Sequence, residues 1–281
     1  MEIESIGVLG AGTMGHGIAQ VAAQAGYRTL LYDVAPSLAE AGLRRIAENL
    51  DKGIERGKVK PAEKQATLQR LSAVSQLGAL AGCGLIIEAI PEDLALKRRV
   101  FQELSQLSGQ AILASNTSSL SVTQIASAAA RPERVVGMHF FNPVHIMKLL
   151  EIVRARQTSD ATVETARRVG ARLGKESIVA RDSPGFASSR LGIALGLEAI
   201  RMLEEGVASA EDIDRAMELG YGYPMGPLKL GDLVGLDVRL AIAEYLHREL
   251  HSDVFRPPKL LQDMVRAGKL GRKTGQGFYK Y

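Results

Sequence analysis

The chain has 281 residues, of which 46% are hydrophobic and 23% charged, a composition typical of a globular protein. A net charge of +4 and the absence of Trp argue against a nucleic-acid-binding protein, which would carry a dense basic stripe or a stacking platform for bases. The single cysteine, Cys83, excludes internal disulfides and a cysteine-based metal site, and we expect no metal. Because we find neither a basic, signal-like start nor an apolar run near the ~20 residues that span a bilayer, we expect a cytoplasmic protein without a membrane segment.

Short apolar runs alternate with helical stretches over about the first 180 residues. Such continuous apolar strands, separated by helices, predict a mainly parallel sheet that is covered on both faces, a doubly wound, Rossmann-like architecture of the α/β class. The predicted strands are Ile6–Leu9, Thr29–Tyr32, Leu85–Ile87, Ala111–Ala114, Val135–Met138, Ile152–Val153 and Ser177–Val179.

A charged helical segment from Ser37 to about Leu71 interrupts this alternation. Gly57 and Pro61 near its middle predict an inserted hairpin of two helices. Its basic residues either form a solvated face or contact an anionic ligand. They are Arg44, Arg45, Lys52, Arg56, Lys58, Lys60 and Lys64.

The pattern changes near Arg181–Pro184, after which no strand is convincing. We therefore expect two domains, residues 1–182 and an all-helical C-terminal domain of residues 183–281. Gly192 and Gly196 lie inside a predicted helix, where glycine is costly, so we expect close packing there, either internal or at a dimer interface. The predicted helices are Leu191–Glu205, Ala210–Leu219, Leu233–Leu250 and Pro258–Ala267.

A glycine-rich segment, Gly10-Ala11-Gly12-Thr13-Met14-Gly15, follows the first strand and opens the first helix. This context favours a dinucleotide site, to which we assign Gly10, Gly12, Thr13, Met14 and Gly15. Gly10 permits the tight turn, Gly12 lets the pyrophosphate approach the backbone, and Gly15 lets helix and strand pack closely. The helix N-terminus presents free N–H groups to the phosphates.

Asp33 ends the second strand, about 20 residues after the glycines, where its carboxylate can accept hydrogen bonds from both ribose hydroxyls. A 2′-phosphate would be repelled there, so NAD is favoured over NADP. Two alternatives stay open at this point: FAD in place of NAD, and a tight strand–helix turn with an acid that caps the helix.

Polar side chains follow several predicted strands, and the carboxyl ends of parallel strands border the ligand crevice of such folds. Oxidation of a secondary alcohol needs a base near neutral pKa, for which His139 is the candidate, with Glu151 twelve residues later as its carboxylate partner. His145 and His16 are rival bases. The segment Asn116-Thr117-Ser118-Ser119 by itself is also typical of a helix N-cap cluster.

Several motifs together resemble the L-3-hydroxyacyl-CoA dehydrogenase family, in particular its short bacterial 3-hydroxybutyryl-CoA dehydrogenases. The resemblance extends over nearly the whole chain. Its carriers are GVLGAGTMGHGIAQ at the start, EAIPED at 88–93, SNTSSL at 115–120, MHFFNPV at 138–144, LLEIV at 149–153, DSPGF at 182–186, MGPLKLGDLVGLDV at 225–238 and GRKTGQGFYKY at the C-terminus.

The resemblance implies NAD-dependent oxidation of a short (S)-3-hydroxyacyl-CoA to 3-oxoacyl-CoA, within fatty-acid metabolism and β-oxidation. His139 resembles the catalytic base, Glu151 its orienting partner, and Ser118 the serine that contacts the substrate's 3-oxygen beside the nicotinamide. The positions that resemble NAD contacts are Glu92, Lys97, Asn142 and Lys273. From its place one helical turn after Asp93, Lys97 could reach ribose or phosphate, and Lys273 lies in a Gly-rich tail that we expect to be flexible.

One position departs from the family pattern. Where the family has Asn four residues after the Phe of PGF, near the thioester, this chain has Ser189, which offers a single hydroxyl in place of an amide. We expect an acyl-CoA substrate and a homodimer through the helical domain, as the resemblance implies. The alternatives are a related NAD-dependent dehydrogenase of a free hydroxy acid or sugar acid, and a non-catalytic NAD-binding structural protein such as an eye-lens crystallin of this fold.

Overall fold

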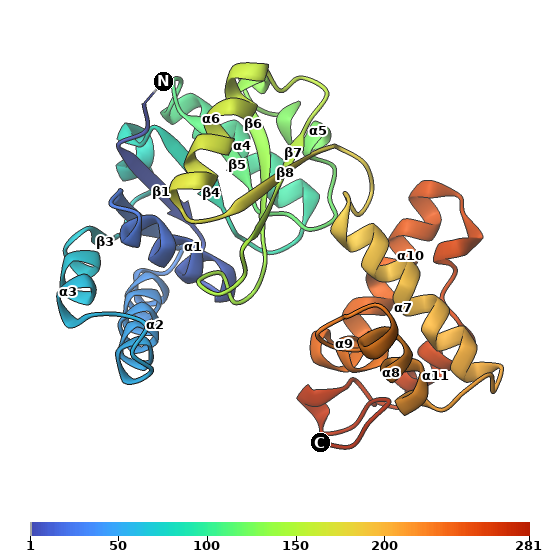
Figure 1. The fold of residues 1–281 in the computed structure, drawn as a ribbon. Coiled ribbons are helices and arrows are strands. Elements are labelled where there is room, and N and C mark those ends of the chain that lie inside the picture. The colour runs from blue at the N-terminus through green and yellow to red at the C-terminus, as the bar shows by residue number, and fades with distance from the viewer. Residues whose placement is uncertain (1) are drawn as a thin grey trace. The chain divides into compact units, whose positions relative to one another are not determined.

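The computed structural model describes residues 2–281, and the chain divides into two compact units (Figure 1). The first unit ends at Asp182 and the second comprises Ser183–Tyr281. Each unit has its own aliphatic core. Within the described residues, no helix is both long and apolar enough to cross a membrane.

An eight-stranded sheet forms the centre of the first unit, in the order β3-β2-β1-β4-β5-β6-β7-β8. All neighbours are parallel except β6 and β7. The order reverses between β1 and β4, which is where doubly wound sheets open a ligand crevice. The strands are β1 (Ser5–Leu9), β2 (Arg28–Tyr32), β3 (Leu71–Val74), β4 (Leu85–Glu88), β5 (Ile112–Ser115), β6 (Val135–Phe140), β7 (Leu149–Arg154) and β8 (Glu176–Arg181).

Helices lie on both faces of this sheet (Figure 1), so the expectation of a doubly wound α/β fold is confirmed. They cover apolar strands such as β4 and β6, in which every residue is buried. The helices of this unit are α1 (Thr13–Gln24), α2 (Pro36–Glu55), α3 (Pro61–Gln69), α4 (Leu94–Leu107), α5 (Val122–Ala126) and α6 (Asp160–Arg172), with short 3-10 turns η1 (Leu77–Gly82) and η2 (Pro132–Arg134).

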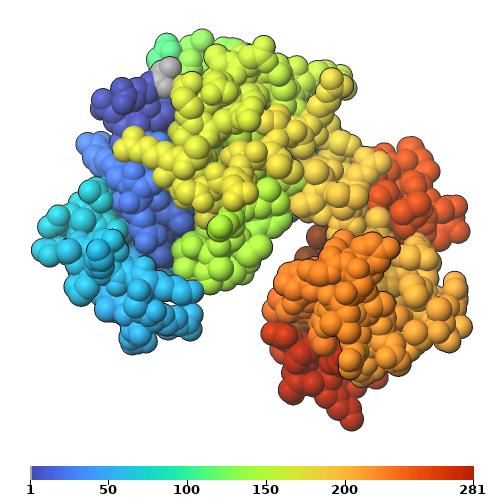
Figure 2. Space-filling model, viewed as in Figure 1, coloured from blue at the N-terminus to red at the C-terminus, as the bar shows by residue number. Residues whose placement is uncertain are grey.

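The inserted helical hairpin is confirmed as α2 and α3, which stand out as a lobe of the first unit (Figure 2). Gly57, with φ of +65°, lies in the connection, and Pro61 begins α3. The sequence prediction missed β3, which directly follows the hairpin. Of its four residues only Leu71 is buried, so this edge strand carries no continuous apolar run to reveal it.

The second unit is all-helical, as expected, and it contains one more helix than the sequence patterns predicted. The segment predicted as a single helix from Leu233 to Leu250 is broken at Gly235, whose φ of +106° a continuous helix does not allow. Inside α7, Gly196 makes room for the Arg239 side chain, because a Cβ there would lie 3.2 Å from its Nη1. The helices are α7 (Ser188–Glu204), α8 (Ala210–Gly220), α9 (Pro227–Val234), α10 (Leu236–Leu250) and α11 (Lys259–Arg266), with 3-10 turns η3 (Asp253–Phe255) and η4 (Arg272–Thr274).

Candidate active site

The side chains of His139 and Glu151 form a buried pair on adjacent strands. In the antiparallel register of β6 and β7 the two residues stand directly opposite each other, so their side chains share one face of the sheet. Nδ1 of His139 lies 2.7 Å from Oε2 of Glu151, and the side chains are 7% and 0% exposed. An ionised carboxylate only accepts hydrogen bonds, so Nδ1 carries the proton and Nε2 is the nitrogen that can accept one.

The rival histidines lack this arrangement. Nδ1 of His16 lies 2.7 Å from the carbonyl of Gly12 within the first turn of α1. The pKa of His145 is lowered by desolvation and then by the nearby cations, which makes it a weaker base at neutral pH. Among residues 2–281, His139 is the histidine that has a carboxylate within hydrogen-bond distance.

The turn after β5 carries Ser118 next to the histidine strand. Asn116 Oδ1 accepts a hydrogen bond of 2.9 Å from the backbone N–H of Phe140, which ties this turn to the end of β6. Glu92, from the turn after β4, accepts hydrogen bonds through Oε1 from the Thr117 hydroxyl at 2.5 Å and from the N–H groups of Ser118 and Ser119 at 3.0 and 3.2 Å. The alternative interpretation of residues 116–119 as a helix N-cap cluster is wrong, because the side chain that caps α5 is that of Ser121.

The glycine-rich turn between β1 and α1 is closely packed at two of its glycines and open at the third. Gly10 has φ of +96°, and a Cβ at Gly15 would lie 1.7 Å from the carbonyl oxygen of Gly10, so both positions require glycine. A Cβ at Gly12 would meet nothing within 4 Å, so this side of the turn is open to a ligand. Thr13 and Met14 begin α1, whose first N–H groups lie at the same edge.

Asp33 follows β2 and lies beside this turn. Its Oδ2 accepts a hydrogen bond of 2.7 Å from the N–H of Ala11, which orients the carboxylate at the edge where an adenosine ribose would lie. The residues present therefore fit a dinucleotide whose 2′-position carries a hydroxyl, since a phosphate would meet this negative charge.

Lys97, which the family resemblance assigns to NAD, is buried beside two carboxylates. Its side chain is only 1% exposed, and Nζ is 2.5 Å from Oε1 of Glu88 at the end of β4. A contact between Lys97 and NAD stays a prediction. Neither the resemblance nor the spacing from Asp93 indicated Glu88 as a partner, although its carboxylate directly follows an apolar run.

Asn142 lies in an exposed loop between β6 and β7. Lys175 supports this loop from below: its buried ammonium donates hydrogen bonds to the carbonyls of Val144 and Met147. Burial lowers the pKa of Lys175. The sequence gave no indication of this lysine, because its partners are backbone atoms about 30 residues away along the chain.

The other two predicted residues belong to the second unit. Ser189 lies half-buried in the first turn of α7. Lys273 makes an ion pair with both carboxylate oxygens of Asp237, each at 2.6 Å. The expectation of a flexible tail around Lys273 is wrong, because the buried carboxylate of Asp232 accepts hydrogen bonds from the N–H groups of Phe278 and Tyr279.

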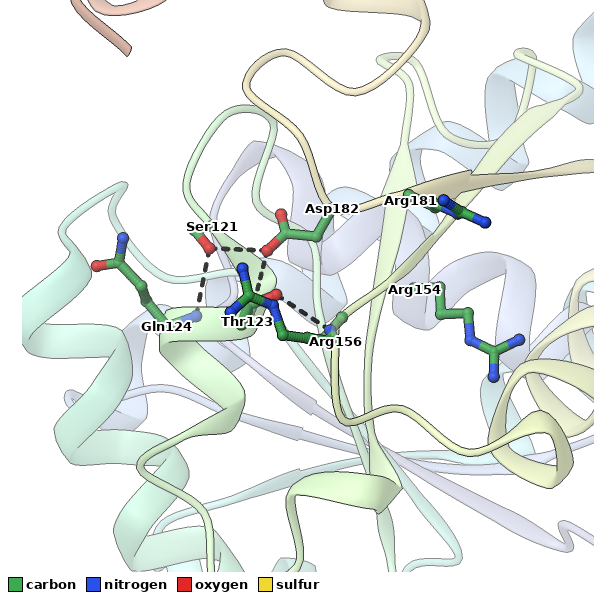
Figure 3. Close-up of a pocket in the computed structure, with 8 residues that line it drawn as sticks. Ser121, Thr123, Gln124, Arg154, Arg156, Arg181 and Asp182 are labelled. Carbon is green, nitrogen blue, oxygen red and sulfur yellow. Dashed lines mark hydrogen bonds between the residues drawn. The ribbon is translucent and has the colours of Figure 1, made fainter. Parts of the chain in front are cut away.

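Figure 3 shows a pocket of about 640 Å³ in the first unit, whose lining includes neither His139 nor Glu151. It is bordered by Arg154, Arg156 and Arg181 and by Asp182, which accepts a hydrogen bond from the Ser121 hydroxyl. Arg154 lies three residues beyond Glu151 on β7, roughly 10 Å along the strand and towards the opposite edge of the sheet. We therefore do not assign this pocket to the active site.

Comparisons with known proteins identify the family of the chain. The model of the 3-hydroxyacyl-CoA dehydrogenase NAD binding domain matches residues 5–183, and that of the C-terminal domain matches residues 185–281. The chain is 45% identical to a probable 3-hydroxybutyryl-CoA dehydrogenase of Bacillus subtilis (strain 168), over 100% of this chain and 98% of that protein. It is also 45% identical to a 3-hydroxybutyryl-CoA dehydrogenase of Bradyrhizobium diazoefficiens, over 99% and 96%. The crystal structure of (S)-3-hydroxybutyryl-CoA dehydrogenase from Ralstonia eutropha superposes with a TM-score of 0.97 at 40% identity, over 100% and 99% of the chains.

The position of Asp33 predicts that Asp33→Ala weakens NADH binding by about 10- to 100-fold, because a charged hydrogen-bond acceptor is lost. The same variant should narrow the preference for NADH over NADPH. Since the chain has no Trp, the fluorescence of the bound nicotinamide can be titrated directly. Asp51→Ala, which removes an exposed carboxylate of α2, is the control. Equal affinities of the wild-type protein for the two nucleotides would contradict the role of Asp33.

Proposed function

The chain belongs to the 3-hydroxyacyl-CoA dehydrogenase family, and we propose that it interconverts (S)-3-hydroxybutyryl-CoA and acetoacetyl-CoA with His139 as the general base. NAD, when bound, accepts the hydride from C3 of the substrate. His139 Nε2 takes the proton of the 3-hydroxyl, and the Glu151 carboxylate stabilises the imidazolium that results. In the reverse direction the same nitrogen returns the proton to the 3-oxygen.

The other residues hold the substrate in this scheme. We assign the Ser118 hydroxyl to the 3-oxygen, whose developing charge it stabilises by a hydrogen bond. Ser189 is assigned to the thioester, where its hydroxyl provides one donor. Asn142 and Lys273 are assigned to NAD, while Glu92 holds the Ser118 turn and contributes to the same cofactor site.

The observation that carries the proposal is the buried contact of 2.7 Å between His139 and Glu151. A protein that only binds NAD has no need to bury a histidine against a carboxylate, so the pair favours a catalyst over a structural protein. The pair alone does not distinguish a thioester from a free hydroxy acid. The family membership favours the thioester.

We predict that His139→Ala lowers kcat for acetoacetyl-CoA reduction by about 10²- to 10⁴-fold, the usual contribution of a general acid or base. NADH binding should be unchanged, because no residue of the glycine-rich turn is altered. Absorbance at 340 nm measures the first quantity and fluorescence titration the second. His251→Asn, at an exposed histidine of the second unit, is the control and should keep near wild-type kcat. Turnover retained in His139→Ala would reject the assignment, and faster oxidation of free 3-hydroxybutyrate than of its CoA ester would favour the alternative substrate.

The nucleotide end of CoA needs cations, and the helical hairpin offers them. A pocket of about 370 Å³ is lined by Lys52, Arg56 and Lys58 of the hairpin and by His145 and Ile146 of the loop after β6. These three cations are exposed, and they lie beside the loop that carries Asn142. We propose that this pocket binds the phosphates of CoA.

This placement predicts that the double variant Lys52→Ala/Arg56→Ala raises KM for acetoacetyl-CoA tenfold or more and leaves kcat within about threefold. Each lost charge-assisted hydrogen bond is worth about 1.5–3 kcal/mol, and the contacts are the same in the ground and transition states. Steady-state kinetics at saturating NADH measures both constants. Arg44→Ala removes an exposed cation of the same helix and serves as the control. An unchanged KM would place CoA elsewhere.

The second unit exposes large apolar side chains, which favours a homodimer through this unit. Leu219 and Tyr221 at the end of α8 are 76% and 77% exposed, and Leu233 on α9 is 48% exposed. The two helices pack against each other, so these side chains contribute to a common region. We propose that a second copy of the chain covers it, because surfaces of this kind mark protein interfaces.

If the chain forms a homodimer, sedimentation velocity should give a mass twice that of the 30.2 kDa chain. Leu219→Asp/Leu233→Asp should sediment as a monomer, since a buried unpaired carboxylate opposes association. Leu107→Asp, on α4 of the first unit, should leave the dimer intact. A wild-type monomer at micromolar concentration would show that the apolar surface has another partner.

A further inference from the structure

Two opposite charges are buried together below the carboxyl edge of the sheet. Glu88 is the last residue of β4 and is 0% exposed, and Lys97 of α4 is 1% exposed. Their charged atoms are 2.5 Å apart. A buried ion pair contributes little net stability compared with apolar side chains of the same volume, because both charges lose their hydration. Fold stability alone therefore does not explain the pair.

Glu88 connects three segments that border the site. Its Oε1 accepts a hydrogen bond of 2.7 Å from the N–H of Ile90, and its Oε2 accepts one of 2.7 Å from the hydroxyl of Ser115. Ser115 ends β5 and is the register partner of Glu88. The carboxylate therefore fixes the ends of β4 and β5 relative to the turn that begins at Ala89.

Lys97 also contacts a second carboxylate, that of Glu92. Its Nζ is 3.4 Å from Oε2 of Glu92 and donates a hydrogen bond of 3.2 Å to the carbonyl of Ile90. The opposite oxygen of Glu92, Oε1, accepts the hydrogen bonds from the Thr117–Ser119 turn. The Glu92 side chain is 39% exposed, so without the lysine it has space to rotate away from the turn.

We propose that Glu88 and Lys97 are positioning residues, which hold Glu92 and, through it, the backbone that presents Ser118 to the substrate. The proposal rests on the proposed function for the role of Ser118. An apolar side chain at 97 would fill the same volume but would not hold the Glu92 carboxylate in place.

The double variant Glu88→Gln/Lys97→Met, the neutral pair, separates a positioning role from a role in stability. It removes both charges together, so neither residue is left as an unpaired buried ion. We expect a folded protein whose kcat for acetoacetyl-CoA reduction at saturating NADH falls at least tenfold, with KM for acetoacetyl-CoA within threefold. Arg154→Met/Asp160→Asn removes an ion pair at the far end of β7 and should keep wild-type kcat. A neutral pair with wild-type kcat overturns the proposal.

Hydrogen exchange followed by mass spectrometry provides a readout that does not depend on activity. In the protein without ligands, peptides covering residues 115–121 should exchange faster in the neutral pair than in the wild type. Peptides from α6 should be unchanged. Unchanged exchange in residues 115–121 overturns the proposal, because the turn would then be held without the ion pair.

A mutant cycle tests whether the three residues act as one unit. Adding Glu92→Gln to the neutral pair should lower kcat little beyond the effect of either change alone, whereas independent effects would multiply. Multiplying effects overturn the proposal.

If the neutral pair does not fold, the variant Glu88→Asp takes its place. It keeps both charges but withdraws the carboxylate from Lys97 by one methylene, so a folded Glu88→Asp variant with wild-type kcat also overturns the proposal. Failure of the wild-type protein to reduce acetoacetyl-CoA would instead reject the proposed function, and the exchange measurement would still test the network.

Discussion

The function that we propose for this chain depends on the hydrogen bond between His139 and Glu151, and that bond depends on the antiparallel pairing of β6 with β7. In this otherwise parallel sheet, one reversal of direction places a histidine and a glutamate twelve residues apart directly opposite each other. Side chains of an antiparallel pair that stand opposite lie on the same face, and burial prevents water from competing for the carboxylate. The strands, and not flexible loops, therefore set the geometry of the base.

Around this pair, the carboxyl ends of the parallel strands supply the remaining groups. The glycine turn follows β1, Asp33 follows β2, Glu92 follows β4 and the Ser118 turn follows β5. Hydrogen bonds then connect neighbouring turns: Asn116 joins the Ser118 turn to β6, and Glu92 joins it to β4. Side chains thus hold the backbone of neighbouring turns through hydrogen bonds, which keeps each turn in place before any ligand binds.

The limits of the sequence interpretation have physical causes. Strand β3 was missed because an edge strand with one buried residue has no apolar period. The break between α9 and α10 was missed because a glycine at the junction of two apolar stretches looks like a tolerated helix glycine until its φ is known. The contact of Lys97 with Glu88 was missed because spacing along a helix says which turn a residue occupies and not which carboxylate encloses it.

By itself, the sequence determined the doubly wound class, the helical hairpin and the glycine turn followed by Asp33, because these depend on local periodicity and on backbone constraints of glycine. It proposed His139 with Glu151 as the base and its partner through motifs of fixed spacing that resemble a family. Only the tertiary structure decided which polar side chains meet. The contacts of Glu88 with Lys97, of Asn116 with Phe140 and of Lys175 with the loop after β6 join residues that are 9, 24 and about 30 positions apart. Their geometry is set by strand order and burial, and neither can be read from residue types along the chain.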